Sequence, residues 1–274
     1  MKRGCKAHLL AGVLFILILA VLCVSCGKAA AKDDDSLQKV LDAKELVLGL
    51  DAHYPPMGFV DESGEITGFD IDMAEEVCKR LGVTLIKQPI NWDEKETELA
   101  EGRIDCIWNG FSVNDSRSES MNLSEPYMIN ELVFAVSGVS GIKSVNDLRG
   151  KRVGIQSGST AVDVLEESAI RSEVEAVERD DNVELLDLLE LGELDAVLMD
   201  SIFAYYYISE KNKDYYLLPN AMATEGIAIG FRKTDAVLRD RVQQIINEMK
   251  KDGSLADISV KWFGTDITTF KRIQ

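Results

Sequence analysis

The chain has 274 residues, 46% of them hydrophobic, and a formal net charge of -17. This length suits one large domain or two lobes of ordinary size, each able to bury its own core. The acidic excess makes nucleic acid a poor partner, because binding phosphates needs a basic face, and it is typical of a well-solvated surface.

The N-terminus has the pattern of an export signal. Lys2, Arg3 and Lys6 precede an apolar run over 9–24, and small residues follow it. This order of a basic and then an apolar region predicts a secretory signal over 1–25, which is left out of the fold. A retained transmembrane anchor is the alternative, because the run approaches the shorter end of spanning lengths.

Cys26 stands where the apolar run stops. Ser25 precedes it and Gly27 follows it in "VSCGK". This stretch resembles the lipobox of bacterial lipoproteins, in which the cysteine receives diacylglycerol, although Cys23 stands where leucine is usual. We predict lipid attachment at Cys26, with ordinary signal-peptidase cleavage nearby as the alternative. The segment 26–43 is predicted to be a flexible tether, because its first part is polar and too poor in apolar residues to pack.

From Leu46 the chain alternates short apolar runs with helical periodicities. Buried strands are predicted over 46–50, 85–90 and 104–108. The stretch "FDIDMAEEVCKRLG" between the first two has apolar residues at spacings of three and four, so it predicts an amphipathic helix that stops at Gly82. The order of strand, helix and strand predicts a parallel sheet covered by helices.

A second α/β set follows the extended segment "ELVFAV" at 131–136. Its strands are predicted over 151–155, 174–177, 195–200 and 226–231. Its helices are predicted to start near Ser159 and Asn182, before a long helix over 235–251 and a short one ending near "KWFG". Two sets of similar size predict two lobes with a cleft, joined by extended segments near 131–136 and 221–226. We place lobe 1 at 44–130 and 224–268, and lobe 2 at 131–223.

Cys78 and Cys106 are the cysteines of the predicted folded part. One falls in a predicted helix and the other in a predicted strand, each among apolar neighbours. A disulfide is possible in an exported protein, but nothing in the spacing demands one, so two buried free thiols are predicted.

The segment "GFSVNDSR", residues 110–117, is predicted to be the loop that leaves a buried strand. Ligands of open α/β sheets bind just beyond the carboxyl ends of strands. Gly110 lets the backbone approach a ligand, Ser112 can donate through its hydroxyl and amide, and Arg117 can hold a carboxylate with two parallel N–H bonds. The alternative for Arg117 is a surface ion pair with Glu119 or Glu125, which is worth little.

Two further segments carry candidate residues. The turn "GIQSGST" leads into a helix marked by Ser159 or Thr160, and a helix N-terminus could hold the other side of the same carboxylate, with ordinary N-capping as a compatible alternative. The turn lacks the glycine spacing of a phosphate loop. Asp200 ends a predicted strand and could accept hydrogen bonds from an ammonium group, or cap a helix. A carboxylate clamp and an ammonium acceptor together describe an α-amino acid.

Four stretches carry a resemblance to a known family: "GFDIDMAEEVCKRLGV", "IDCIWNGFSVNDSRSESMNLSEPY", "VGIQSGST" and "DAVLMD". In this order they resemble the family 3 extracytoplasmic solute-binding proteins of polar amino acid ABC transporters, over about Leu46 to Gly264. The resemblance implies an α/β, two-lobed type II periplasmic-binding-protein fold. Each lobe would be a mainly parallel sheet covered by helices, with the ligand between lobes that close about two crossing strands.

The resemblance also implies roles for single residues. Arg117 matches the arginine that binds the ligand α-carboxylate, assisted by Ser112 and Thr160. Asp200 matches the aspartate that receives the α-ammonium, helped by Ser112 and the Gly110 carbonyl.

A second group of residues is implied to surround the ligand. Asp51 and Tyr54 match the first loop of the side-chain pocket, with Tyr54 as an aromatic wall. Trp92 matches an apolar or aromatic residue over the ligand, and Asn109 a small polar residue that touches it. Ordinary packing is the alternative for Tyr54 and Trp92. Gln156 stands where some acidic-amide binders carry lysine, which argues against glutamate as the ligand.

The resemblance implies a lipid-anchored, extracytoplasmic monomer that captures a polar α-amino acid and delivers it to an ABC transporter permease. It implies no catalytic residue, cofactor or metal. A cyclohexadienyl-dehydratase-like enzyme is the alternative on the same fold, and it would need a general acid in the cleft. A ligand-binding sensor component is the other alternative, and the sequence does not identify the amino acid.

Overall fold

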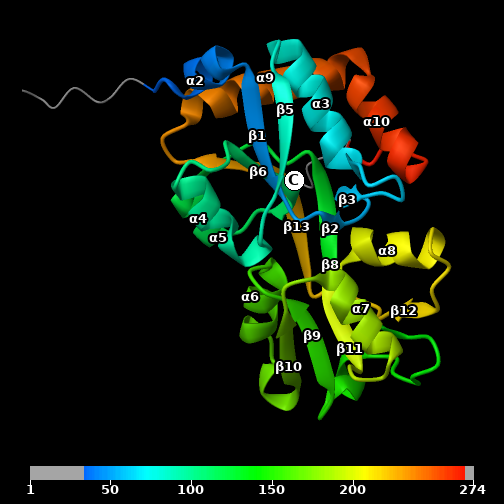
Figure 1. Cartoon of the computed structure of the whole chain (residues 1–274). Helices are drawn as coiled ribbons and strands as arrows, with labels where there is room; N and C mark the ends of the chain where they lie inside the picture. Colours follow the sequence, from blue (N-terminus) through cyan, green and yellow to red (C-terminus); the bar gives the residue numbers. More distant parts are fainter. Residues whose placement is uncertain (1–33, 269–274) are drawn as a thin grey trace, which may run out of the picture. The chain divides into compact units, whose positions relative to one another are not determined.

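The computed structural model describes residues 34–268 (Figure 1). The predicted signal over 1–25 and the predicted lipid attachment at Cys26 lie outside these residues. Within 34–268, no helix has both the length and the apolar character needed to cross a membrane.

One sheet runs through the described fold in the order β10-β9-β11-β8-β13-β6-β1-β5. Its strands are β1 (Glu45–Leu50), β5 (Thr84–Pro89), β6 (Cys106–Ser112), β8 (Met128–Ser137), β9 (Arg152–Gln156), β10 (Glu175–Arg179), β11 (Ala196–Asp200) and β13 (Ala223–Arg232). At one end β1 pairs in parallel with β5 and β6, and at the other β9 pairs in parallel with β10 and β11. The predicted α/β class with parallel strands in each set is therefore confirmed.

The two long strands β8 and β13 join these ends. They pair with each other antiparallel, with Glu225 opposite Asn130, while β8 also pairs with β11 and β13 with β6. The chain passes from the first set to the second along β8 and returns along β13 (Figure 1). The extended segments predicted near 131–136 and 221–226 are thus two sides of one strand pair.

Helices alternate with the strands. They are α2 (Ser36–Ala43), α3 (Phe69–Leu81), α4 (Lys95–Ala100), α5 (Asp115–Ser120), α6 (Thr160–Glu167), α7 (Asn182–Glu190), α8 (Ser201–Ser209), α9 (Ala236–Asp252) and α10 (Ser254–Phe263). Helix α3 buries Ile71, Ala74 and Val77, as its periodicity predicts, and Gly82 ends it in the left-handed conformation. The short strands are β2 (His53–Tyr54), β3 (Gly58–Val60), β4 (Ile66–Thr67), β7 (Met121–Leu123) and β12 (Tyr215–Leu217).

The predicted tether over 26–43 is wrong in its second half. Ser36–Ala43 forms helix α2, which packs against α9 and buries Val40. Leu37 packs against the same core from one helical turn away. These two apolar residues pack once helix α9 covers them, and the local composition of the segment does not show that such a partner exists.

The predicted boundary of the third strand is also wrong. Strand β6 starts at Cys106 and continues to Ser112, with every residue buried. Asn109, Gly110 and Ser112 therefore lie in a strand rather than in the loop predicted to follow 104–108. The physical reason is pairing with β13, since Ile227 lies opposite Ser112 and Ala228 opposite Phe111.

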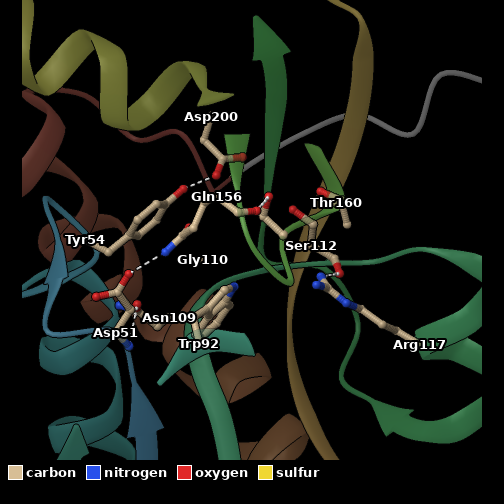
Figure 2. A pocket seen from close by; sticks show the side chains of 11 residues that line it. Asp51, Tyr54, Trp92, Asn109, Gly110, Ser112, Arg117, Gln156, Thr160 and Asp200 are labelled. Atoms are coloured by element: carbon tan, nitrogen blue, oxygen red, sulfur yellow. Dashed lines mark hydrogen bonds between the residues drawn. The ribbon is translucent and has the colours of Figure 1, made fainter. Parts of the chain in front are cut away.

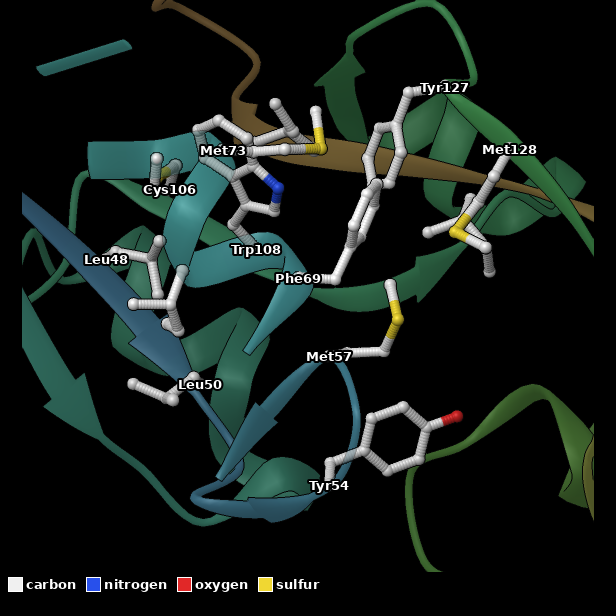
Figure 3. Packing of buried hydrophobic residues seen from close by; sticks show 14 of the residues in the cluster. Leu48, Leu50, Tyr54, Met57, Phe69, Met73, Cys106, Trp108, Tyr127 and Met128 are labelled. Atoms are coloured by element: carbon white, nitrogen blue, oxygen red, sulfur yellow. The ribbon is translucent and has the colours of Figure 1, made fainter. Parts of the chain in front are cut away.

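The core beneath the first set of strands is aromatic and thioether-rich. Figure 3 shows Phe69 beside Tyr127, with Met57 between Phe69 and Tyr54. Cys78 and Cys106 are buried in this core as free thiols, which confirms the prediction. The core thus reaches Tyr54, a residue of the candidate site.

Candidate functional site

A cavity with about 310 Å³ of empty volume is surrounded by residues from both sets of strands (Figure 2). Its lining residues are Asp51, Tyr54, Trp92, Asn109, Gly110, Ser112, Arg117, Gln156, Ser159, Thr160 and Asp200. The structure therefore brings all ten residues selected from the sequence to one place. Gln156 is the additional member, at the end of β9.

Arg117 lies at the cavity on helix α5, and only 5% of it is exposed. Its Nη1 donates to the Ser112 carbonyl at 2.7 Å and its Nη2 to the Gly158 carbonyl at 3.2 Å. The guanidinium carbon lies 4.2 Å from the centre of the Phe111 ring. Within 34–268 no carboxylate forms an ion pair with Arg117, so the alternative of a surface pair with a nearby glutamate is wrong.

Burial affects the charge of Arg117. It lowers the pKa of the guanidinium, and an arginine still keeps its proton at neutral pH. A guanidinium has five N–H donors, of which backbone carbonyls occupy two here. A buried cation with spare donors is suited to bind an anionic group that enters the cavity.

Asp200 lies at the other end of the cavity, where β11 passes into α8. Its carboxylate accepts hydrogen bonds from the Tyr54 hydroxyl and from the Asn130 amide. Its side chain makes no capping bond to α8, so the helix-cap alternative is not what the structure shows. Burial raises the pKa of Asp200 to about 7, with Glu225 also raising it.

Asn130 and Glu225 are site residues that the sequence did not single out. Asn130 is 2% exposed and also accepts from the Ser201 hydroxyl at 3.3 Å. The Thr160 hydroxyl donates to Glu225 at 2.9 Å. The sequence offered no signal for Asn130, because in strand β8 the polar Asn130 is buried while the apolar Ile129 beside it is exposed.

Asp51 lies beside Gln156 on the wall of the cavity. Its carboxylate accepts from the His53 amide N–H and from Gln156 Nε2, both at 2.9 Å. Burial raises the pKa of Asp51. Gln156 is held by Asn182, which donates to its Oε1 at 2.6 Å. Asn109 accepts from the Asp51 N–H at 3.2 Å, while its own buried Nδ2 has no partner among the described residues.

Tyr54 and Trp92 line the cavity and also pack in the core. The Tyr54 ring stacks on Phe203 with a centroid distance of 5.2 Å, and Trp92 meets Phe111 edge-on at 6.1 Å. Packing and cavity lining are therefore not exclusive for these residues. Gly110 has a φ of 57°, and a Cβ there would lie 2.7 Å from Tyr54 Cε1, so close approach of the Tyr54 ring requires glycine.

Ser159 and Thr160 stand at the start of α6. The Ser159 hydroxyl donates to the Gln156 carbonyl at 2.7 Å and does not cap the helix. Ordinary capping by its side chain is thus not observed. The described residues contain no group of three or more histidine, cysteine or acidic side chains suited to a metal ion. The cavity can pair both charged groups of a zwitterion, through Arg117 and Asp200.

Comparisons with known proteins agree with this arrangement. The L-cystine-binding protein TcyJ of Escherichia coli K12 is 32% identical over 268 residues, covering 96% of this chain and 98% of that protein. A Streptococcus pneumoniae ABC uptake transporter substrate-binding protein, solved with bound histidine, is 36% identical with a TM-score of 0.84, covering 88% and 100% of the two chains.

A third relative is an ancestral amino acid-binding protein described as a precursor of cyclohexadienyl dehydratase. It is 29% identical with a TM-score of 0.77, and the match covers 83% of this chain and 99% of that chain. These solved relatives confirm the two-lobed α/β fold. Residues 46–265 match the family described as bacterial extracellular solute-binding proteins, family 3. The chain therefore belongs to family 3 of the bacterial extracellular solute-binding proteins.

Proposed function

We propose that the protein captures a polar α-amino acid outside the cytoplasm and delivers it to an ABC transporter permease. The observation that carries the proposal is a pair of ionisable groups on one cavity, the buried Arg117 and the partly buried Asp200. Both ends of an α-amino acid are charged, so enclosing it requires a hydrogen-bonded partner for each charge. The cystine-binding relative and the relative solved with bound histidine support an amino acid ligand.

The proposed roles follow the contacts around the cavity. Arg117 would bind the α-carboxylate together with Ser112, Ser159 and Thr160. Asp200 would receive the α-ammonium, whose N–H groups would replace the Tyr54 hydroxyl as its donor.

The remaining lining residues would contact the side chain of the ligand. Tyr54 and Trp92 offer aromatic surfaces, and the Gly110 carbonyl would help to hold the ammonium. Asp51 and Asn109 offer a buried carboxylate and an unpartnered amide, which suit a polar ligand side chain.

We also propose that the two lobes close about the strand pair β8 and β13. Lobe 1 would comprise 44–130 and 224–268, and lobe 2 would comprise 131–223. The protein would work as a monomer whose closed form docks on the permease.

Family members act outside the cytoplasm, and we propose that this one is held at the membrane by lipid on Cys26. Mass spectrometry of the mature N-terminus would detect a diacylglyceryl cysteine. A mature chain that starts elsewhere, without lipid, would refute the anchor and leave ligand binding untouched.

A thermal-shift screen of the standard amino acids plus ornithine, citrulline and cystine tests the proposal. A ligand at 100 times its dissociation constant should stabilise the protein by about 2.7 kcal/mol. If none of these compounds shifts the melting temperature, the proposed function is wrong.

Arg117→Ala tests the carboxylate clamp. The variant should lose measurable binding of each amino acid that the wild type binds, because the ligand carboxylate would be buried without a partner. Calorimetric titration is the measurement, and Arg171→Ala, which removes a partly exposed arginine paired with Glu166, is the control. Unchanged affinity in Arg117→Ala would contradict the clamp.

We further propose that the protein is a binder without enzymatic activity. The carboxyl groups on the cavity, Asp51 and Asp200, each accept two hydrogen bonds and are suited to ligand contacts. Incubation with prephenate and arogenate, followed by absorbance of an aromatic product, is the test. Product formation would favour the dehydratase-like alternative, which one relative's description makes relevant.

A further inference from the structure

Lys95 is a buried cation beside the cavity. It is the first residue of α4, and only 3% of it is exposed. Its Nζ donates to the Trp92 carbonyl at 3.0 Å and to the Gly158 carbonyl at 2.7 Å. No ion pair involves it within the described part of the chain. Lysines are almost never buried to this degree without a partner, so its position requires an explanation.

The Gly158 carbonyl joins Lys95 to Arg117. It accepts from Lys95 Nζ and also from Arg117 Nη2, so two buried cations lie close together on one oxygen. Neighbouring like charges oppose each other, most strongly where water is excluded. An anion placed beside them would relieve this repulsion.

The charged groups around Lys95 come from three helices and the turn before α4. Burial and, after it, the charge of Arg117 on α5 lower the pKa of Lys95 to about 8. The acidic groups oppose this lowering, and they are Asp93, Glu96 and Asp163. Lys95 is therefore mainly protonated at neutral pH and titrates only slightly above it.

The turn that Lys95 holds carries two proposed ligand contacts. Gly158 precedes Ser159 and Thr160, and it has a φ of 67°. A Cβ at this position would lie 2.8 Å from the Asp93 backbone, so the turn sits directly against the start of α4. The Lys95 side chain links the two segments, because its Nζ donates to the Trp92 carbonyl before α4 and to the Gly158 carbonyl in the turn.

We propose that Lys95 is a positioning residue of the carboxylate site and its second positive charge. It holds the Gly158 turn against α4, so that Ser159 and Thr160 stay at the cavity, and its charge adds to the field of Arg117 on a ligand carboxylate. This inference rests on the proposed function, because it concerns the same site. Of the three ammonium donors, two are used on carbonyls.

Ligand binding next to Lys95 would change its affinity for a proton. A bound carboxylate stabilises the charged form of Lys95 and raises its pKa above about 8. Above that pH, binding therefore takes up a proton, and affinity falls as pH rises. A residue that only filled space would show no such linkage.

The test compares wild type, Lys95→Met and Lys95→Arg by calorimetric titration with L-histidine, L-cystine and L-arginine. Titrations on both sides of pH 8, in buffers of different ionisation enthalpy, measure affinity and proton uptake. Lys95→Met should bind roughly 10- to 100-fold more weakly below that pH, as expected for a lost hydrogen bond from a charged group. Its proton uptake above that pH should be smaller than in wild type. The ligand's own amino group titrates equally in all three proteins.

Lys95→Arg separates charge from structure, because arginine keeps its proton throughout. It should bind within a few-fold of wild type and show the same reduced proton uptake as Lys95→Met. If Lys95→Met does not fold, the inference is tested by Lys95→Arg alone. Proton uptake in Lys95→Arg equal to that of the wild type would then overturn the inference. Lys79→Met, which removes an exposed lysine on α3, is the matched control and should resemble wild type.

The outcomes distinguish this inference from the proposed function. If the wild type binds an amino acid and Lys95→Met binds it with the same affinity and the same proton uptake, only the role of Lys95 is overturned. A wild-type protein that binds none of the amino acids of the thermal-shift screen would overturn the proposed function, and this inference with it.

Discussion

At the scale of single residues, Asp200 combines a burial cost with a proposed binding role. Among residues 34–268 its carboxyl accepts from two neutral donors, Tyr54 and Asn130, and burial raises its pKa. An ammonium group would supply the missing positive charge and favour the ionised form. If Asp200 receives the ammonium group as proposed, its side chain should be partly protonated without ligand and ionised with it.

Ligand affinity should depend on pH through Asp200. The carboxyl pKa of about 7 means that, below this pH, an ammonium ligand must displace a proton. Affinity should therefore fall up to about tenfold per pH unit below 7. Calorimetry of L-histidine, L-cystine and L-arginine binding across this range is the measurement. For L-histidine, the titration of the ligand's own imidazole is subtracted.

Two variants complete this experiment. Asp200→Asn should bind weakly at every pH, because it lacks the negative charge. Asp61→Asn, which changes a partly exposed aspartate that does not line the cavity, should keep the wild-type profile. An unchanged pH profile in Asp200→Asn would rule out Asp200 as the linked group.

At the scale of elements, the strand pair β8 and β13 does more than connect two sets of strands. Asn130 and Glu225 lie opposite each other in this pair, and each contacts a candidate site residue of the second set. Asn130 donates to Asp200, and Glu225 accepts from Thr160. Movement of these strands would therefore shift the hydrogen-bond partners of Asp200 and Thr160 at the cavity.

Asn130→Asp tests this connection. The substitution keeps the size of the side chain but removes the donor to Asp200 and adds a carboxyl beside it. The Asp200 pKa should rise further, because a like charge disfavours ionisation. The pH at which ligand affinity begins to fall should therefore move upward by about one unit or more, as measured by calorimetry.

The matched control for this substitution is Asn212→Asp. Asn212 is exposed in the turn after α8, so it adds the same charge away from the cavity. It should leave the pH profile unchanged. A wild-type profile in Asn130→Asp would show that the Asn130 amide does not set the Asp200 pKa.

At the scale of the described molecule, polar contacts cross the cavity between the two sets of strands. Lys95 reaches Gly158, Gln156 reaches Asp51, and Tyr54 reaches Asp200. At the rim, Asn114 donates to Asp163 at 3.2 Å, and His53 lies 3.0 Å from an Asp181 oxygen. Polar and ionisable side chains of the two sets of strands thus meet at the cavity.

The stability of the ligand-free protein should fall as pH rises from about 4 to about 7. Asp70 and Asp200 both have pKa values raised to about 7 by burial, so the folded state keeps protons that the unfolded state releases near pH 3.8. Urea unfolding across this range should show the loss, and Asp200→Asn should make it smaller.

Asp252 provides an internal comparison. Its pKa is lowered to about 2, so its contribution to stability is lost below pH 3.8 and does not overlap this window. Stability that rises between pH 4 and 7 would contradict the protonation of Asp70 and Asp200 in the folded state.

The amino-acid sequence by itself determined the order of strands and helices, the free thiols at Cys78 and Cys106, and the candidates for the carboxylate and ammonium sites. Short-range periodicity and the residues at strand ends carry this information. These signals are local, so a single chain displays them without its fold. The binding roles of Arg117 and Asp200 stay predictions.

Only the tertiary structure decided which polar side chains are buried together. Asn130, Glu225 and Lys95 are far apart in the sequence and have no motif of their own. They became site residues because β8 pairs with β13 and because α4 meets the Gly158 turn. Pairing with β13 also extended β6 through Gly110, and packing on α9 turned the predicted tether into α2. Such contacts depend on distant partners, which local patterns do not contain.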